Sequence, residues 1–371
     1  MALTQVGLER LNTATTKKIG TNKNLIINGA MEVAQRGTSS TSAGYQTVDR
    51  VQFAKGGTDE TPTQAQVDVS SGTTPYTSGF RKAYKITNGN QTGGAGTSDN
   101  IIAFRYHIEA QDIANSGWNY TSTSSYITLS FWIKSSVAQS FQGVLTSEDG
   151  TRQIYPFATG SLSADTWTKI TKTIPGNSNI TFDNDDGKGL TLEIIGFSGS
   201  DFATDSATIN AWQARTSGNQ FGRASTSTWY TTDNATLEMT GFQLEVGSVA
   251  TDFEHRSFAE ELNLCKRYFQ VHNENGKFTG NTSYYRSGSI ETQFKFEPEM
   301  RATPTFSAAS GTNYYYFYRN NGFDNFDSWG STNAMGQRGG AVNASTSSAS
   351  NGEAGAMYVN TGGTLHFSAE L

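Results

Sequence analysis

The feature that most limits what this chain can fold into is a series of short segments in which apolar and polar residues alternate. In residues 125–136 (SYITLSFWIKSS), isoleucine, leucine or phenylalanine occupies every second position from 127 to 133. A period of two is typical of a β-strand with one buried face. Segments 165–175, 190–197 and 237–247 show related patterns, and stretches rich in glycine, serine and asparagine separate them. Many short strands with turn residues between them predict an all-β fold, most simply a β-sandwich.

One short segment has helical periodicity instead. Ser257 and Glu260 have the spacing of a capping box, in which the hydroxyl and the carboxylate satisfy reciprocal backbone donors at a helix start. Acidic residues follow in the first turn and basic residues in the last, which suits the helix dipole. The apolar positions of the segment recur at spacings of four, three and four, and are Phe258, Leu262, Cys265 and Phe269. We therefore expect a short amphipathic helix over residues 257–269 with one apolar stripe.

These patterns divide the chain into four parts. Residues 1–22 carry only a sparse apolar set, Leu3, Val6 and Leu11, among threonines that disfavour a helix. We expect a tail that orders against another subunit, with a frayed terminus as the alternative. Residues 23–256 form the predicted sandwich, 257–269 the linker helix, and 270–371 a smaller C-terminal β-domain whose early strands are interrupted by Pro298 and Pro304.

Composition and charge exclude several classes of protein. The 22 Phe, 16 Tyr and 6 Trp are too many for a disordered chain. The chain has 27 basic and 33 acidic residues, and the basic residues are not clustered in the sequence. We therefore expect neither nucleic acid nor an anionic membrane as a partner. No apolar run approaches the ~20 residues of a membrane-spanning helix, so we expect no membrane insertion. The single cysteine, Cys265, excludes an intrachain disulfide and indicates a reducing compartment of synthesis.

The sequence lacks recognisable catalytic motifs. It has no HExxH, no GxSxG and no Walker-type loop, and its 4 histidines are not at metal-ligand spacing. The possibility of a catalytic pair of carboxylates, as in glycosidases, stays open, because the two residues of such a pair need not be close in sequence. The acidic run 183–187 favours a turn over a calcium loop, since its glycine comes one position early for an EF-hand. We expect no enzymatic activity and no cofactor apart from the calcium considered below.

An aromatic tract at residues 313–329 (NYYYFYRNNGFDNFDSW) is the best candidate for a binding surface. Sugar rings present apolar C–H faces that stack on aromatic side chains, while short polar side chains bond to their hydroxyl groups. The tract therefore predicts glycan binding, with packing in a core or a subunit interface as the alternative, since tyrosine is enriched in both. The candidate glycan-binding residues are Tyr314, Tyr316, Tyr318, Arg319, Asn320, Asp324 and Trp329.

Several segments together resemble a module of bacteriophage tail-fibre and virion-surface proteins that is common in marine phages. They are NLIINGAMEVAQRGTS and TVDRVQF within 24–53, SFWIKSS at 130–136, DTWTKITKTIP at 165–175, and MTGFQLEVGSVATDFEHRSFAEELNLCKRYFQ at 239–270. The last of these is the most specific, and the resemblance covers most of residues 24–270. The segment FEPEMRATPTF at 296–306 is similar to the strand that often follows this module.

The resemblance implies a jelly-roll sandwich akin to carbohydrate-binding modules, synthesised in the host cytoplasm and displayed on the virion surface, as a tail fibre or on the capsid exterior. Such fibres are usually homotrimers, so we expect self-association, with residues 1–22 attached to other virion proteins. Related carbohydrate-binding modules often hold a structural calcium through the acid of an NG-x-x-E segment, here Glu32. The Asp-rich partner strand of that site is replaced here by FQLE, which leaves Glu32 and Glu245 as candidate calcium ligands.

The function expected from these observations is adhesion of the virion to host surface polysaccharide, with residues 270–371 as the distal, recognising part. The first alternative is a capsid decoration, knob or tail structural protein without a ligand of its own. The second is a depolymerase that cleaves the surface polysaccharide.

Overall fold

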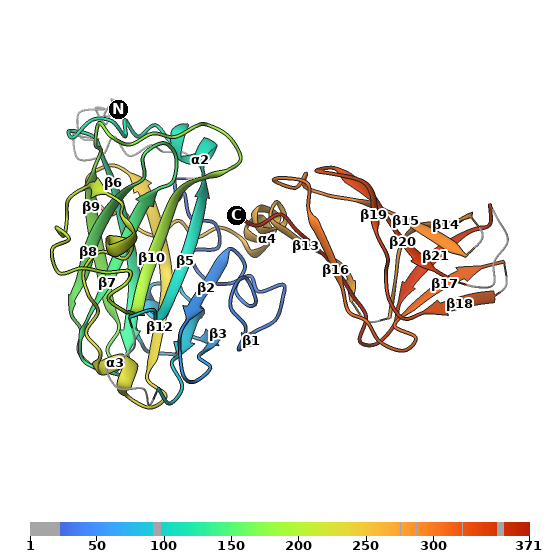
Figure 1. Ribbon diagram of the computed structural model, residues 1–371, viewed down its shortest axis with the longest axis horizontal. Coiled ribbons are helices and arrows are strands. Elements are labelled where there is room, and N and C mark those ends of the chain that lie inside the picture. The colour runs from blue at the N-terminus through green and yellow to red at the C-terminus, as the bar shows by residue number, and fades with distance from the viewer. Residues whose placement is uncertain (1–22, 92–97, 275, 287, 321, 347–351) are drawn as a thin grey trace, which may run out of the picture.

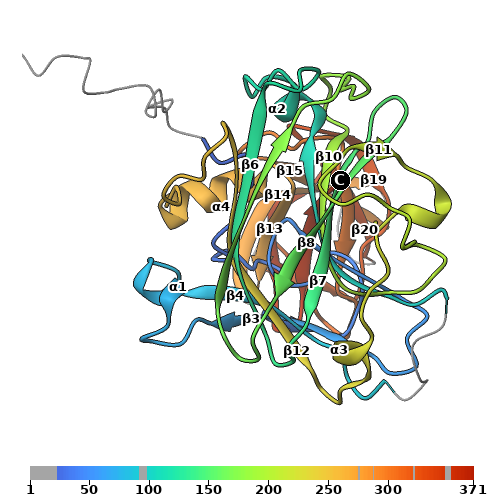
Figure 2. The same ribbon diagram turned by 90° about the vertical axis from the view of Figure 1, so that its left-hand side faces the viewer.

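The computed structural model describes residues 23–371 apart from 92–97, 275, 287, 321 and 347–351. Two β-rich bodies follow one another along the long axis of the molecule and meet at helix α4 (Phe258–Lys266) (Figure 1). Viewed from the end of the first body, the second lies behind it (Figure 2). This architecture confirms the predicted all-β class. The predicted anchoring residues Leu3, Val6 and Leu11 lie outside the described residues.

The first body is a sandwich of two antiparallel six-stranded sheets. One sheet consists, in spatial order, of β1 (Ser39–Ser40), β3 (Thr63–Asp68), β4 (Lys82–Thr87), β12 (Thr236–Val246), β6 (Tyr126–Ser135) and β9 (Thr168–Pro175). The other consists of β11 (Gln213–Ala214), β8 (Gln153–Ser161), β7 (Ser140–Ser147), β10 (Lys188–Ser198), β5 (Ile101–Glu109) and β2 (Val51–Gly56). The connections include α1 (Thr74–Thr77), α2 (Ala110–Ala114), η2 (Ser217–Asn219) and α3 (Thr228–Thr231). Late strands insert between early ones, as in the predicted jelly roll.

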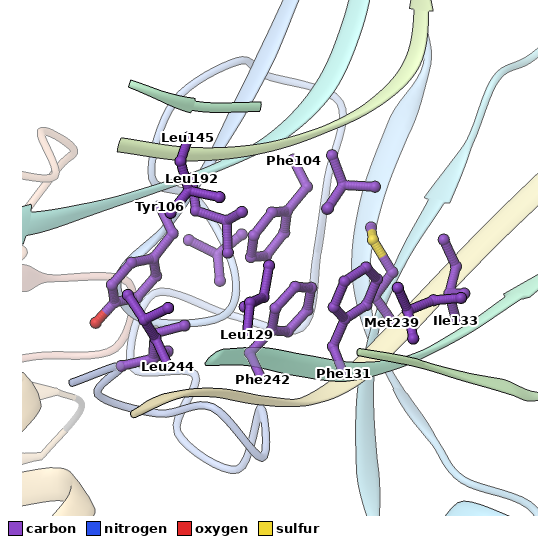
Figure 3. Packing of buried hydrophobic residues seen from close by; sticks show 14 of the residues in the cluster. Phe104, Tyr106, Leu129, Phe131, Ile133, Leu145, Leu192, Met239, Phe242 and Leu244 are labelled. Atoms are coloured by element: carbon purple, nitrogen blue, oxygen red, sulfur yellow. The ribbon is translucent and has the colours of Figure 1, made fainter. Parts of the chain in front are cut away.

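The core of this sandwich follows from the alternation in the sequence. The apolar positions of β6, among them Phe131, are buried as predicted. The ring of Phe242 of β12 stacks between two others (Figure 3). Its centroid lies 4.8 Å from that of Phe131, in the same sheet, and 4.7 Å from that of Phe104, in the opposite sheet. On the other face Thr128 and Ser130 are buried too, whereas Trp132 and Lys134 are partly exposed, so the expectation of a half-buried strand was wrong for the first part of β6. The chain after β12 returns along that face, and Thr128 Oγ1 donates to the carbonyl of Gly247 at 2.7 Å.

Helix α4 begins where the capping box predicted. The backbone nitrogen of Glu260 donates to Ser257 Oγ at 3.3 Å, and that of Ser257 donates to Glu260 Oε2 at 2.9 Å. The helix ends at Lys266, and Phe269 already belongs to the next strand. The predicted helix over 257–269 was therefore too long at its C-terminal end.

The predicted apolar stripe of this helix was wrong at its first position. Phe258 is 59% exposed, whereas Cys265 is fully buried. Glu261 is buried in its place, because its carboxylate accepts a hydrogen bond from the backbone of Asn28 and pairs with Arg256 at 3.4 Å. A buried carboxylate with two partners thus occupies the face that the periodicity assigned to apolar packing.

The second body is a smaller sandwich of two antiparallel sheets, one three-stranded and one seven-stranded. The small sheet consists of β13 (Phe269–Glu274), β22 (Thr364–Ser368) and β16 (Thr305–Ala308). The large sheet consists, in spatial order, of β18 (Gly322–Phe326), β17 (Tyr315–Arg319), β21 (Ala354–Val359), β14 (Lys277–Arg286), β15 (Ser289–Lys295), β20 (Gly339–Ser345) and β19 (Thr332–Gly336). Pro298 and Pro304 lie between β15 and β16, as predicted, and the aromatic residues of both sheets form a separate core.

Buried ion pairs join the two bodies at the point where the C-terminus returns to the first one. Glu370 pairs with Arg50, which is 1% exposed and whose guanidinium carbon lies 3.4 Å from the ring centroid of Tyr268. Glu109 accepts hydrogen bonds from Arg267 at 2.9 and 2.8 Å. Burial alone would raise the pKa of Glu109, but these bonds and one from Tyr268 hold it below its usual value. The junction is therefore charged, paired and largely shielded from water.

Candidate functional site

The candidate site arises from the alternation of strand β17 within the aromatic tract. Tyr315 and Phe317 point into the core of the second body and are completely buried. Tyr316 and Tyr318 lie on the opposite, outer face of the seven-stranded sheet. Two of the predicted glycan-binding residues are thus placed on an exterior surface by the period of two.

Strand pairing adds three further rings to this outer face. Tyr316 lies opposite Tyr358 of β21, which lies opposite Phe278 of β14, and Tyr318 lies opposite Phe323 of β18. Neighbouring ring centroids are 5.2 to 6.2 Å apart, and most of these contacts are edge-to-face. Such contacts stabilise the arrangement of the rings before any ligand binds. We call these five residues the aromatic face.

The aromatic face is open to solvent. Phe278 is 60% exposed, Phe323 54% and Tyr318 37%, so three large rings, with Tyr318 in contact with the other two, project from one sheet. Isolated exposed aromatic residues are ordinary, but a contiguous apolar patch on a protein surface usually marks a binding site. This cluster is therefore the strongest candidate for function in the described part of the chain.

Polar side chains border the aromatic face. Asn281 of β14, Gln293 of β15 and Asn325 of β18 are exposed on the same side of the sheet, and Asn325 lies directly opposite Tyr316. Amides both donate and accept hydrogen bonds. The surface thus combines ring faces and edges with groups that can bond to hydroxyls.

Of the predicted residues Arg319, Asn320 and Asp324, the first two lie at one end of this surface, whereas Asp324 lies opposite the buried Phe317, on the inner face of the sheet. Arg319 Nε donates to Asp324 Oδ2 at 3.0 Å, and Arg319 Nη1 lies 3.3 Å from Glu353 Oε1. Asn320 is exposed in the turn between β17 and β18. Arg319, Asn320 and Phe323 border an open hollow of about 560 Å³.

Two predicted glycan-binding residues are half-buried and pack against the core instead. Trp329 packs in the core, with its ring centroid 5.4 Å from that of Tyr315 and 5.2 Å from that of Phe326. Tyr314 precedes β17, and its ring lies against Gly311 and Gly362, where an added Cβ would approach it to 2.4 and 2.7 Å. Neither is on the aromatic face, so for these two residues the alternative of core packing is the correct one.

Three residues of the aromatic face escaped the sequence analysis. Phe323 lies within the tract, and the alternation of GFDNF at 322–326 could have identified it. Phe278 and Tyr358 lie outside the tract and join it only because β14 and β21 pair beside β17. No local signal indicates that pairing.

The candidate calcium ligands have other partners in the structure. Glu245 accepts hydrogen bonds from Gln243 Nε2 at 2.8 Å, from Thr251 N at 2.7 Å and from Thr251 Oγ1 at 2.7 Å. Burial raises the pKa of Glu32, while the nearby cations Lys82 and Arg81 act in the opposite direction. Donors and cations, rather than further oxygen ligands, surround these carboxylates. The geometry gives the calcium site no support, and it stays an untested prediction.

A second candidate surface, the outer face of the first body's second sheet, is covered. Phe202 and Phe221, from the connection after β10, pack on Ala103 and Ile195 of that sheet. Beside them Arg105 Nε lies 2.6 Å from Glu193 Oε1. Burial raises the pKa of Glu193, although the Arg105 guanidinium opposes this shift. Although these side chains point away from the core of the sandwich, the connection after β10 packs against them, and they do not form an open binding surface.

The same part of the molecule holds a neutral histidine. His107 Nδ1 lies 2.8 Å from Thr191 Oγ1, and Thr191 Oγ1 donates to Glu148 Oε1 at 2.5 Å. Burial lowers the pKa of His107 well below its usual value. In the described part of the chain, no group of three or more His, Cys, Asp or Glu side chains is arranged to hold a metal ion. Nor does any helix described there have the length and apolar character needed to span a bilayer.

No protein-family model matches the sequence, and no curated protein does. Among solved structures, the enzymatically active domain of tailspike protein 4 of bacteriophage CBA120 aligns at 9% identity and a TM-score of 0.32, over 61% of this chain and 22% of that longer one. A family 11 carbohydrate-binding module of a Clostridium thermocellum cellulase aligns at 11% identity and a TM-score of 0.26, over 59% of this chain and 98% of the module.

A tandem of two family 22 carbohydrate-binding modules from Paenibacillus barcinonensis aligns at 10% identity and a TM-score of 0.28, over 94% of this chain and 98% of the tandem. These are alignments of low sequence identity and low TM-score. They do not transfer a ligand to this chain.

Proposed function

We propose that this chain binds glycans through the aromatic face and serves as an adhesin on a phage virion. The observation that carries the proposal is the cluster of five contacting rings, three of them well exposed, on the outer face of the seven-stranded sheet. A cluster of this kind is unfavourable in water unless it meets a ligand or a partner.

Two properties of the surface favour a glycan as that ligand. The bordering groups are mainly amides and hydroxyls, such as Asn281, Ser283 and Asn325, which match sugar hydroxyls. The rings are held by one another and by the sheet, so little side-chain freedom is lost when a sugar stacks on them.

The position of the surface suits an adhesin. Strands β14, β17 and β18 lie at the end of the molecule away from the first body (Figure 1). In the proposed virion, residues 1–22 attach the chain to other virion proteins, and the second body carries the aromatic face toward host surface polysaccharide. We propose a homotrimer without enzymatic activity, in line with the resemblance to tail-fibre proteins.

The test measures retention of the full chain on immobilised bacterial surface polysaccharides, with each of Phe278→Ala, Tyr318→Ala and Phe323→Ala as variants. Point substitutions are preferable to removing residues 270–371, because truncation would leave Arg50 buried without Glu370. Tyr285→Ala is the matched control, since Tyr285 is 67% exposed on β14 but makes no ring contact with the aromatic face among the described residues.

We expect the three variants to bind at least about tenfold more weakly and Tyr285→Ala to bind like the parent chain. Equal retention of all four variants would refute the aromatic face as the binding surface. If the rings are instead buried between copies, sedimentation will show that the three variants dissociate the assembly, which favours the structural alternative. Release of reducing ends from the bound polysaccharide would indicate the depolymerase.

A further inference from the structure

The three most exposed rings of the aromatic face form a row across the sheet. The ring centroids of Phe278 and Tyr318 are 5.3 Å apart, and those of Tyr318 and Phe323 are 5.5 Å apart. Ala356 of β21 lies opposite Tyr318, between β17 and β14, and its small side chain lets the rings meet above it. The row thus crosses the strands from β14 to β18.

Half-buried rings support this row. Tyr358 contacts Phe278 at 5.2 Å and Tyr318 at 5.7 Å, both edge-to-face. Tyr316 contacts Phe323 at 5.2 Å in the same way. Because each ring of the row has such a neighbour, its orientation is fixed before binding, and the three rings present one continuous surface.

Both ends of the row are open. Phe323 lies on β18, the edge strand of the sheet, and a hollow of about 560 Å³ lined by Tyr318, Asn320 and Phe323 lies beside this end of the row. A second hollow of about 540 Å³ adjoins Phe278 and includes Asn281 and Gln293. A site for the end of a chain needs a wall that stops it, whereas this row reaches the edge strand of the sheet at Phe323 and adjoins a hollow with polar groups at Phe278.

The cations that line the two hollows are paired with carboxylates. Arg319 interacts with Asp324 and Glu353 at one end, and Lys295 pairs with Glu297 at the other. Among the residues that the structure describes, an acidic polymer would therefore find no unpaired cation lining these hollows. The other titratable group of the second hollow, His272, is uncharged at neutral pH, because burial lowers its pKa to about 4.

We propose that the row Phe278–Tyr318–Phe323 binds an internal stretch of an extended, uncharged polysaccharide, with successive sugar units on successive rings. This inference rests on the proposed function and adds the substrate class. It requires that affinity grows with chain length until the row is filled, and that a single sugar or a chain end is not recognised by itself.

The test uses the full chain and isothermal titration with cello-, manno- and malto-oligosaccharides, from the monosaccharide to the hexasaccharide. For the series that binds, we expect affinity to rise at least about tenfold with length and then to level off. Phe278→Ala and Phe323→Ala remove the two ends of the row, so each should shorten the length at which affinity levels off. Tyr285→Ala should not change it, and thermal unfolding checks that every variant is folded.

A comparison of polymers tests the charge. Immobilised dextran, mannan and mixed-linkage β-glucan are uncharged, and alginate and polygalacturonate are acidic. Retention on an uncharged polymer that salt does not weaken is the expected result. Retention only on the acidic polymers, or equal affinity for the monosaccharide and the hexasaccharide, overturns this inference. The proposed function still holds in either case if substitution of the rings weakens that binding. Failure to bind any of these sugars overturns the inference, and the proposed function then depends on its own test with bacterial polysaccharides.

Discussion

The two bodies present the same kind of surface in opposite circumstances. In the first, the outward residues of β5 and β10 lie beneath the connection after β10, where Phe221 is only 3% exposed. In the second, the outward residues of β14, β17 and β18 have no such cover among the described residues, and Phe323 is 54% exposed. Both faces obey the same period of two, so the difference arises from one long connection.

The comparison shows what decides whether a sheet face contributes to stability or to binding. Where a connection covers the face, aromatic and charged side chains there lose water and must find partners, as Arg105 and Glu193 do. Where the face is open, its aromatic residues add little to stability and remain available to a ligand. The following experiments measure this difference, in order of decreasing expected effect.

The largest effect is expected from Phe221→Ala on the covered face. Removing a buried phenylalanine loses its transfer free energy and leaves a cavity, so the free energy of unfolding should fall by about 3–5 kcal/mol. Denaturant unfolding followed by fluorescence measures the change. A loss no larger than that of Phe323→Ala would mean that the connection does not cover the sheet as described.

Arg105→Ala tests the ion pair beside the same connection. The substitution leaves the buried Glu193 carboxylate without its partner, which should lower the free energy of unfolding by roughly 2–4 kcal/mol. Arg105→Lys keeps the charge and serves as the control. Since a protonated Glu193 needs no cation, the deficit of Arg105→Ala should shrink at acidic pH, and a deficit independent of pH would contradict the assignment.

The third experiment concerns His272, which packs against Phe294, Phe296 and Phe367 beneath the open sheet. Burial lowers its pKa to about 4, against ~6.5 in the unfolded chain. The unfolded chain therefore gains a proton first, and stability should fall as the pH drops from about 6.5 toward 4, on the order of 1–3 kcal/mol.

His272→Gln should reduce this slope, as read from unfolding midpoints across that pH range. The pKa values of His107 and His366 are also lowered by burial, so part of the slope belongs to them. An unchanged slope in His272→Gln would show that His272 titrates normally in the folded protein.

The smallest effect on stability is expected from Phe323→Ala on the open face. With more than half of the side chain in water, the free energy of unfolding should change by less than about 1 kcal/mol. Glycan retention should nevertheless fall about tenfold. A variant that loses stability and binding together would remove the distinction between the two faces.

Local patterns predicted much of the fold. Alternation identified the long strands, the capping box at Ser257 identified the start of α4, and the aromatic tract contained Tyr316 and Tyr318. Contacts between distant segments could not be predicted in this way. Phe278 reaches the aromatic face through strand pairing, and Arg50 pairs with a residue 320 positions later in the chain.

The errors have the same origin. The periodicity of α4 assigned Phe258 to the interior, but Arg256 and the backbone of Asn28 favour a carboxylate, Glu261, on the buried face. Trp329 resembled a ligand-stacking residue until the other strands supplied a core around it. Residue type and spacing show which groups can bind a ligand, whereas tertiary packing decides which of them remain exposed.

The return of the C-terminus to the junction determines how the molecule carries a mechanical load. The second body is held at both of its chain ends, by the continuous backbone from α4 into β13 and by Glu370 in its pairs with Arg50 and Arg36. A pull on the aromatic face is thus shared by two parallel attachments near one point. A tag fused after Leu371, whose backbone oxygen accepts a hydrogen bond from Tyr45, would therefore weaken the second of these attachments.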